Sequence, residues 1–244
     1  MAFAGFNKFF KDTIPWLLFT NHCLYCNKLI GKNDSLCDDC KENLPVIGEE
    51  RCKYCGADKL RCSCKKHRKG YDAIVAPFYY EDGIKTAIHN LKFNGKEFVA
   101  DVLAEDMARV VKTEYKNVEF DFICYVPFTF SQRIKRPYNQ SELLALNLSQ
   151  NLNIPVENVM VKYFDTKGQH NTPYKERAGS VFGIYDIAEN MDVNGKTILL
   201  VDDVKTSGAT LDECAWILRI RGAEKVCCVV SAIAGIKSKE EKKE

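Results

Sequence analysis

The sequence predicts an α/β fold in which a mostly parallel sheet is flanked by helices and is preceded by a cysteine-rich domain. Three observations lead to this prediction. Apolar, strand-like runs alternate with helical patterns from residue 71 onward. Eight of the twelve cysteines fall between positions 23 and 64. Between residues 198 and 210, an apolar run is followed by two acids and a polar loop that leads into a helical pattern.

Residues 1–19 are expected to form a short amphipathic helix. Lys11 and Asp12 interrupt its apolar residues, and the uninterrupted run Ile14–Phe19 is far shorter than the ~20 residues of a membrane-spanning helix. No secretory signal pattern is visible. We therefore expect a cytoplasmic protein whose first helix packs on the rest of the chain, with a weak membrane-surface contact as the alternative.

The segment 20–68 carries two sets of cysteines with metal-ligand spacing. Each Cys-x2-Cys turn places two thiolates on one knuckle, and two facing knuckles complete a tetrahedral zinc site with no open position, so both sites are expected to be structural. We expect sequential rather than interleaved pairing, which the spacing alone does not settle. The expected ligands are Cys23, Cys26, Cys37 and Cys40 in the first site, and Cys52, Cys55, Cys62 and Cys64 in the second.

A disulfide framework is the alternative for these cysteines, but it requires an oxidising compartment. Few large apolar residues occur in this segment, so bound metal would supply much of its folding free energy. His22 and His67 flank the clusters and are expected to be solvated neighbours rather than ligands. The remaining cysteines lie in apolar surroundings and are expected in the core: Cys124, Cys214, Cys227 and Cys228.

Residues 71–236 are expected to form the second domain, after a basic connection at Lys65–Gly70 and before a charged, solvated tail at 237–244. Because its strands alternate with helices, the sheet should be mostly parallel, with ligands bound outside the carboxyl ends of the strands. The expected strands are 73–80, 120–126, 159–164, 196–201 and 226–233, and the expected helices are 83–91, 98–111, 141–152 and 210–221.

The segment from 198 to 210 is the strongest functional signal. Asp202 and Asp203 are expected where the strand ends, and a Thr-Ser-Gly loop then enters a helix. Amides and hydroxyls at a helix N-terminus favour phosphate, while paired acids accept hydrogen bonds from sugar hydroxyls. Together they suit a phosphorylated ribose, whereas an ordinary helix cap would not explain the acids. The candidate phosphate-binding residues are Val204, Lys205, Thr206, Ser207, Gly208, Ala209 and Thr210.

Two further segments carry candidate site residues. Arg133 and Arg136 belong to a basic loop that follows a strand, and Arg forks there would suit pyrophosphate unless the loop is merely solvated. The polar segment Tyr163–Arg177 is expected to be a mobile loop that closes over a site or stays in solvent. Within it, Gln169 and Arg177 are the candidates for contacting an anion or a base.

The chain resembles the ComF family of phosphoribosyltransferase-like proteins, and its acidic strand and loop resemble the 5-phosphoribosyl-1-pyrophosphate (PRPP) loop of type I phosphoribosyltransferases. Pro137 stands where the family has Gly, which removes one amide from the basic loop. Ser180 stands where an Asn is usual. The residues that carry the resemblance are the cysteine knuckles at 23–64, Leu91–Gly95, Val126, Pro127, Arg133, Arg136, Tyr138–Ala145, Thr166, Gln169, Arg177 and Val201–Thr210.

The resemblance implies a double zinc ribbon, a type I phosphoribosyltransferase-like domain, and a role in natural transformation with DNA imported as single strands. If transfer occurs, Asp202 and Asp203 would hold the ribose hydroxyls. Arg133 and Arg136 would stabilise departing pyrophosphate, with magnesium bound mainly by the substrate. No residue is assigned as a general base.

Three functions remain open on the sequence alone. The first is glycosyl transfer from PRPP to a base or related nucleophile. The second is a single-stranded DNA-binding module without transferase activity, favoured by the eight Lys and Arg of residues 51–70, although the net charge of +2 excludes the whole chain as an obvious polyanion binder. The third is a zinc-ribbon docking surface for another protein, such as a helicase of the same pathway.

Overall fold

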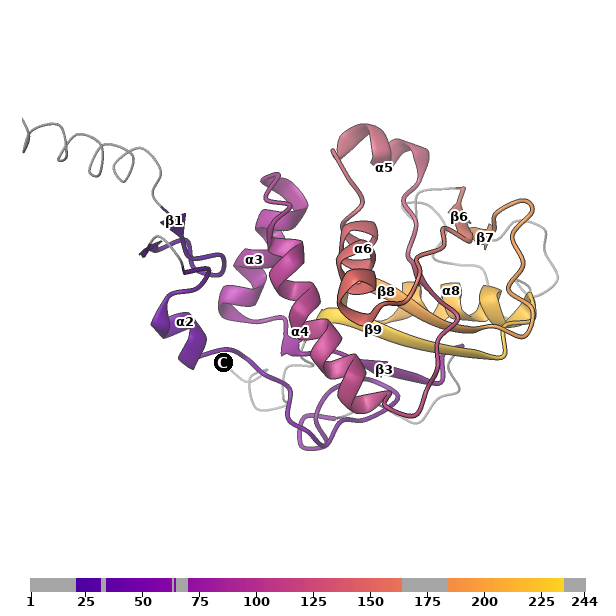
Figure 1. Cartoon of the computed structure of the whole chain (residues 1–244), viewed down its shortest axis with the longest axis horizontal. Helices are drawn as coiled ribbons and strands as arrows, with labels where there is room; N and C mark the ends of the chain where they lie inside the picture. Colours follow the sequence, from indigo (N-terminus) through magenta and orange to yellow (C-terminus); the bar gives the residue numbers. More distant parts are fainter. Residues whose placement is uncertain (1–20, 32–33, 63, 65–69, 164–183, 235–244) are drawn as a thin grey trace, which may run out of the picture.

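A parallel sheet lies at the centre of this computed structural model, which describes residues 21–31, 34–62, 64, 70–163 and 184–234 (Figure 1). Its strands lie side by side in the order β3 (Ala73–Val75), β9 (Lys225–Ile233), β8 (Thr197–Lys205) and β5 (Phe122–Tyr125). A short strand, β4 (Phe78–Tyr79), pairs further along β9. All of these pairings are parallel, which confirms the predicted fold class.

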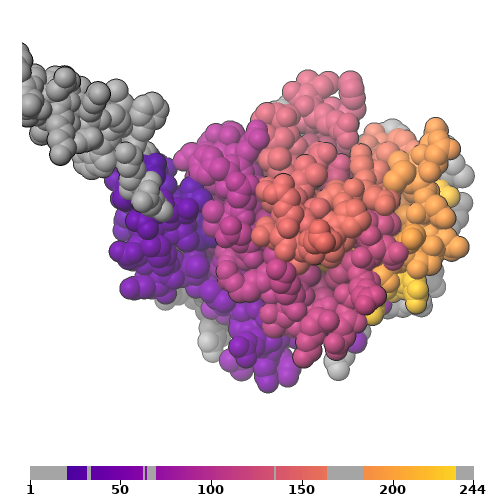
Figure 2. Space-filling model, viewed as in Figure 1, coloured from indigo at the N-terminus to yellow at the C-terminus, as the bar shows by residue number. Residues whose placement is uncertain are grey.

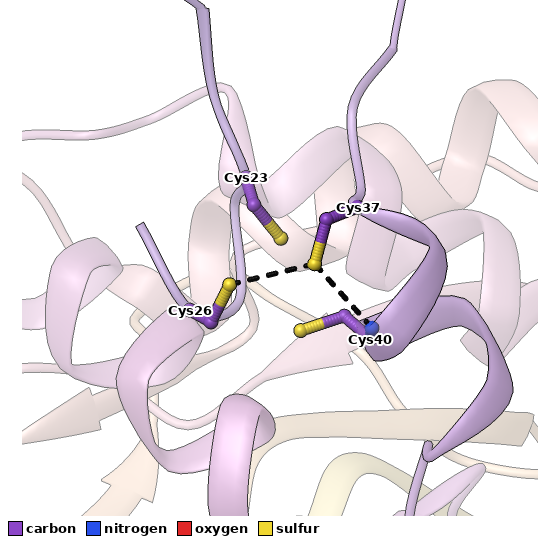
Figure 3. A group of neighbouring side chains, drawn as sticks. All are labelled: Cys23, Cys26, Cys37 and Cys40. Carbon is purple, nitrogen blue, oxygen red and sulfur yellow. Dashed lines mark hydrogen bonds between the residues drawn. The ribbon is translucent and has the colours of Figure 1, made fainter. Parts of the chain in front are cut away.

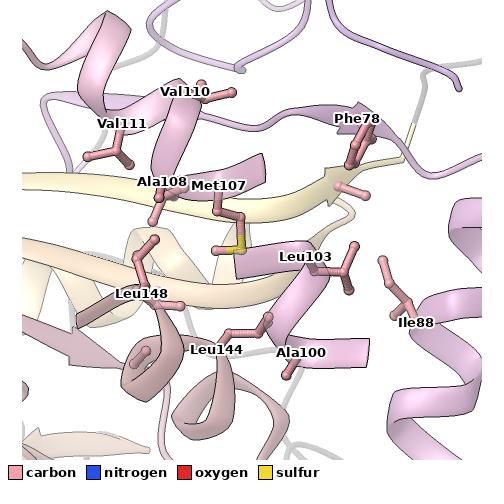
Figure 4. Close-up of a cluster of buried hydrophobic side chains, with 14 of the residues drawn as sticks. Phe78, Ile88, Ala100, Leu103, Met107, Ala108, Val110, Val111, Leu144 and Leu148 are labelled. Atoms are coloured by element: carbon pink, nitrogen blue, oxygen red, sulfur yellow. The ribbon is translucent and has the colours of Figure 1, made fainter. Parts of the chain in front are cut away.

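Helices cover the sheet because its strands are apolar on both faces. One face packs against α3 (Asp82–Phe93), α4 (Val99–Glu114) and α6 (Gln140–Leu152). Figure 4 shows Leu103 and Met107 of α4 near Leu144 and Leu148 of α6 in this core. The opposite face packs against α8 (Ala209–Ile220). Successive strand residues alternate between the two cores, as a period of two requires.

The edge strand expected at 73–80 is split into β3 and β4. Both parts pair with β9, and Pro77 lies between them. Proline has no amide hydrogen to give to a ladder, so the strand is interrupted there. The carbonyl of Pro77 instead accepts a hydrogen bond of 2.9 Å from the amide of Ile47, which ties the edge of the sheet to the cysteine-rich region.

The strand expected at 159–164 does not join the parallel sheet. Instead, β6 (Met160–Lys162) pairs antiparallel with β7 (Tyr185–Ile187) in a separate two-stranded sheet. Met160 and Tyr185 are buried in the core that α8 closes. The apolar side chains of this segment are therefore buried by packing against α8 and not by joining the parallel sheet.

The two regions that carry the four-cysteine groups are called the first and the second cysteine knuckle from here on. They pack on opposite faces of the central sheet. The first holds β1 (Asn21–His22), β2 (Leu29–Ile30) and α2 (Asp38–Glu42), and it buries Tyr25 in the core beneath α3. The second buries Cys55 and Ala57 in the other core. Figure 2 shows the indigo N-terminal region lying directly against α3. The cysteine-rich segment therefore shares its cores with the sheet.

Several expectations lie outside the described residues: the helix at 1–19, the basic connection at 65–69, the loop with Gln169 and Arg177, and the tail at 237–244. A search of the described helices found none that combines the length and apolarity needed to cross a membrane.

Candidate functional site

The two adjacent acids lie where β5 leaves the sheet. β5 ends at Tyr125, opposite Val201 of β8, whereas β9 accompanies β8 to its last residue. The prediction that the strand ends at Val201 is therefore wrong: Asp202 and Asp203 lie inside β8, because pairing with β9 continues past them. One side of β8 is no longer paired with β5 at this point, and such carboxyl ends are where parallel sheets bind ligands.

Asp202 is held by two hydrogen bonds to one of its oxygens. The hydroxyl of Ser141, at the start of α6, donates to Oδ1 over 2.8 Å. The amide of Asp203 donates to the same oxygen over 2.9 Å. Burial and the neighbouring Asp203 charge raise the pKa of Asp202 to about 7, while these hydrogen bonds and Lys92 oppose the rise.

Asp203 pairs with a lysine from a distant part of the chain. The Nζ of Lys92, near the end of α3, lies 2.8 Å from Oδ2 of Asp203. The two side chains are only 22% and 13% exposed, respectively. Within the described ranges, Oδ2 of Asp202 and Oδ1 of Asp203 accept no hydrogen bond. Each acid thus has one oxygen held by a partner and one without a partner among the described residues.

Between the acids and α8 lies the loop expected to bind phosphate. Gly208 precedes the helix with φ of +80°, a conformation that favours glycine, and a Cβ there would lie 3.0 Å from Cε of Lys205. The side chain of Lys205 is thus buried beneath Gly208. The hydroxyl of Ser207 accepts from the Ala209 amide over 3.3 Å, and Thr210 hydrogen-bonds Tyr185 of β7.

Most of this loop is open to solvent. Thr206, Ser207, Ala209 and Thr210 are exposed, whereas Val204 is half-buried and packs on the core. The first amides of a helix have no partner within the helix, and together with its dipole they favour an anion. The exposed part of the predicted loop therefore has the chemistry to hold a phosphate beside the two acids.

The basic segment expected as a loop contains a helix, α5 (Phe130–Lys135), which projects from the body of the molecule (Figure 1). Thr129 and Gln132 form a reciprocal capping box, which explains why the segment is helical. Arg133 is exposed on this helix. Arg136 follows it, and its guanidinium lies 5.2 Å from the ring centre of Phe93.

The first four-cysteine group has its sulfur atoms turned toward one another (Figure 3). Within each group all sulfurs lie within 4.8 Å of one another, with 3.5 Å between Cys26 and Cys37 and 3.6 Å between Cys52 and Cys64. Thiolates about 2.3 Å from a tetrahedral zinc lie about 3.8 Å apart, so both groups fit zinc. The groups are Cys23, Cys26, Cys37 and Cys40, and Cys52, Cys55, Cys62 and Cys64, which is the sequential pairing expected.

Sequence reasoning missed two partners of the acids. Lys92 and Ser141 both occur in motifs that carried the family resemblance, but neither was given a role. Each contacts an acid more than sixty residues away along the chain. The sequence features that could have pointed to them are the position of Lys92 inside the motif Leu91–Gly95 and that of Ser141 at the expected start of a helix.

Comparison with known proteins gives matches to two family models. The model described as the phosphoribosyl transferase domain matches residues 100–244, and the double zinc ribbon domain matches residues 15–69. The chain is 27% identical to Competence protein F of Haemophilus influenzae, covering 85% of this chain and 95% of the relative. It is 27% identical to Competence protein ComFC of Streptococcus pneumoniae, with coverage of 83% and 90%. It is 26% identical to DNA utilization protein YhgH of Escherichia coli K12, with coverage of 84% and 86%.

Proposed function

This chain belongs to the phosphoribosyl transferase domain family, in the ComF group that carries a double zinc ribbon, and we propose that it binds PRPP or another 5-phosphoribosyl ligand in DNA uptake. One observation carries the proposal. Two fixed carboxylates, each with an available oxygen, lie in β8 directly before a solvent-exposed loop at the start of α8.

In this proposal Asp202 and Asp203 accept hydrogen bonds from the ribose hydroxyls. The segment from Thr206 to Thr210 holds the 5-phosphate with its amides and hydroxyls. Magnesium would enter with the pyrophosphate of the ligand and neutralise part of its charge. One N–H of Arg136 donates to Gln140 over 3.1 Å, which leaves the other N–H groups of its guanidinium for pyrophosphate. Arg133 is the exposed candidate for that contact.

Transfer to an acceptor is the activity that such a site would support. The bond from the anomeric carbon to pyrophosphate would break, and a nucleophile of the acceptor would replace it. Positive charge that develops on the sugar ring would be stabilised by the acids beneath it. The acceptor, a base or related nucleophile, would have to supply its own proton acceptor or use one outside the residues assigned above.

The test is calorimetric titration of the zinc-loaded protein with PRPP and magnesium. We expect the wild type to bind and Asp202→Asn/Asp203→Asn to lose about tenfold or more in affinity, because charged acceptors form stronger hydrogen bonds than amides. A matched control is Asp101→Asn/Glu105→Gln, which neutralises two exposed acids on α4. Absence of binding by the wild type, or equal binding by the acid variant, would contradict the proposal.

A second candidate function is binding of single-stranded DNA by the surface around α5. Phe130 is 78% exposed on that helix, next to the exposed Arg133. The Arg136 guanidinium lies 5.2 Å from the ring centre of Phe93 and 5.4 Å from that of Phe128. Aromatic rings that stack with bases, combined with cations, are typical of surfaces that bind single strands.

Fluorescence anisotropy with a labelled thymidine oligonucleotide tests this candidate. Binding should weaken steeply between about 50 and 200 mM salt, because phosphate contacts release counterions. It should also weaken in Phe130→Ala/Arg133→Ala but remain in Leu146→Ala/Lys112→Ala, which alters exposed residues elsewhere. Binding that ignores both salt and the α5 variant would reject the candidate.

We also propose a cytoplasmic location, because four-thiolate zinc sites require reduced cysteines. The double zinc ribbon remains a candidate docking surface for a helicase of the uptake machinery. Pull-down with the full zinc-loaded protein and a purified candidate helicase would test that contact.

A further inference from the structure

Lys92 reaches the carboxylate pair from another layer of the fold. It lies near the end of α3, whereas the acids belong to the central strand β8. Its Nζ lies 2.8 Å from Oδ2 of Asp203, and its side chain is 22% exposed. A lysine so enclosed is held in one geometry, unlike the exposed lysines of surface ion pairs.

The backbone around Lys92 is fixed by contacts on both sides. The hydroxyl of Tyr138 donates to the carbonyl of Leu91 over 2.6 Å, and Leu91 itself is fully buried. Just beyond α3, the Nζ of Lys96 donates to Oδ1 of Asn27 in the first cysteine knuckle over 3.1 Å. The end of α3 is therefore tied to the segment before α6 and to the knuckle.

The start of α3 is also fixed by the first knuckle. A Cβ on Gly83 would lie 2.9 Å from Cβ of Tyr25 and 3.7 Å from Sγ of Cys40. No side chain fits between the helix and the knuckle at this point. The first cysteine knuckle thus packs against the start of α3 and hydrogen-bonds Lys96 just beyond its end, and the helix holds Lys92 against Asp203.

The titratable groups around Asp202 come from several elements. Asp203 lies beside it on β8, and Tyr185 of β7 faces it from the α8 side of the sheet. The thiols of Cys214 on α8 and Cys228 on β9 also lie near it. Lys92 brings a positive charge to this group, and it favours the ionised form of Asp202.

We propose that Lys92 is a positioning residue that fixes Asp203 and offsets the negative charge of the carboxylate pair, so that both free oxygens can accept ribose hydroxyls. Ser141 performs the matching task for Asp202. The ligand part of this inference rests on the proposed function, whereas the effect of Lys92 on the charge of the pair does not.

The first measurement follows the carboxylate of Asp202 by 13C NMR in protein with labelled aspartate, assigned with Asp202→Asn. Lys92→Met keeps the aliphatic stem and removes the charge, so the pKa of Asp202 should rise by about 1 unit. Lys92→Arg should restore much of the wild-type value. Lys85→Met removes an exposed charge two turns earlier on α3 and should leave the value unchanged.

The second measurement titrates the same proteins with ribose 5-phosphate at pH 6 and pH 8. Lys92→Met should bind about tenfold more weakly than wild type, with the larger loss at pH 6, where the higher pKa of Asp202 in the variant leaves a smaller fraction of this acid ionised than in wild type. An unchanged Asp202 titration in folded Lys92→Met overturns the inference. A different outcome is that the pKa of Asp202 shifts in Lys92→Met while no protein, wild type included, binds ribose 5-phosphate. That result supports the effect of Lys92 on the charge of the pair and rejects the proposed function.

Discussion

At the scale of single residues, the acids of β8 have unlike partners. Asp202 accepts from a hydroxyl and an amide, whereas Asp203 faces an ammonium group. These contacts are not visible in the sequence, because they join segments far apart in the chain. The adjacent acids and the loop after them could be predicted, since one local pattern contains them all. Their role in binding stays a prediction.

The raised pKa of Asp202 makes protein stability depend on pH. The pKa of Asp202 is about 7 in the folded protein, against an ordinary value of 3.8, so the folded protein keeps a proton that the unfolded chain releases. Ionisation of Asp202 therefore reduces stability as pH rises from about 4 to about 7. Below about pH 4, Asp202 is protonated in both the folded and the unfolded protein, so its ionisation no longer affects the free energy of unfolding.

Asp202→Asn should accordingly gain stability relative to wild type as pH rises. We expect the difference in free energy of unfolding to grow by on the order of 1–3 kcal/mol between pH 4.5 and pH 8, because the amide cannot ionise. Urea unfolding of zinc-loaded proteins measures it, and zinc release at low pH affects both proteins alike. Glu189→Gln, which alters an exposed acid, is the control. A constant difference would show that Asp202 ionises normally.

At the scale of elements, the sequence predicts where helices and strands occur better than where they pair. The helices at 83–91, 98–111, 141–152 and 210–221 are found with small changes at their ends. β8 is longer than expected because β9 pairs with it beyond Val201. The segment of β6 pairs with β7 outside the parallel sheet. Such errors arise because pairing depends on neighbours that one segment does not contain.

The helix α5 was missed for a local reason. Arg133, Lys135 and Arg136 lie ahead of Pro137, and their charge alone indicates a basic loop. The capping box of Thr129 and Gln132 was the available helix signal. The helix presents Arg133 on an exposed surface.

The second cysteine knuckle is docked on the sheet through a glycine. Gly56 has φ of +79°, and a Cβ there would lie 2.5 Å from Cδ1 of Ile233 and 3.3 Å from the carbonyl oxygen of Ile74. Gly56→Ala should lower the free energy of unfolding by about 2–4 kcal/mol, combining a left-handed backbone with overpacking. Urea unfolding of the zinc-loaded protein measures the loss.

Gly95→Ala separates the two causes. Gly95 has φ of +64°, but nothing lies within 4 Å of a Cβ placed on it. The free energy of unfolding of Gly95→Ala should therefore fall only by the cost of the left-handed backbone, about 1–2 kcal/mol. If the two variants lost equal stability, close packing between the knuckle and the sheet would have no measurable role.

At the scale of the whole molecule, the cysteine-rich segment and the sheet form joint cores. The first knuckle packs in the core of α3 and α4, and the second packs in the core of α8. The sequence predicted two zinc ribbons before a second domain, because cysteine spacing is a local signal. It did not predict that the ribbons would contact α3 and the edge of the sheet, which depends on surfaces from both regions.

This arrangement connects the zinc sites with the proposed ligand site. The first knuckle contacts the start of α3 and a residue just beyond its end, and α3 carries the lysine that pairs with Asp203. The first ribbon thus supports the helix that holds Lys92 beside the acids.

The central claim, that the acids of β8 and the loop before α8 bind a phosphoribosyl ligand, is tested most directly by a crystal structure. The zinc-loaded protein should be crystallised with PRPP and magnesium. We expect the ribose hydroxyls within hydrogen-bond distance of Oδ2 of Asp202 and Oδ1 of Asp203, with the 5-phosphate on Thr206–Thr210. PRPP bound elsewhere, or a site that stays empty at saturating PRPP, would contradict the claim.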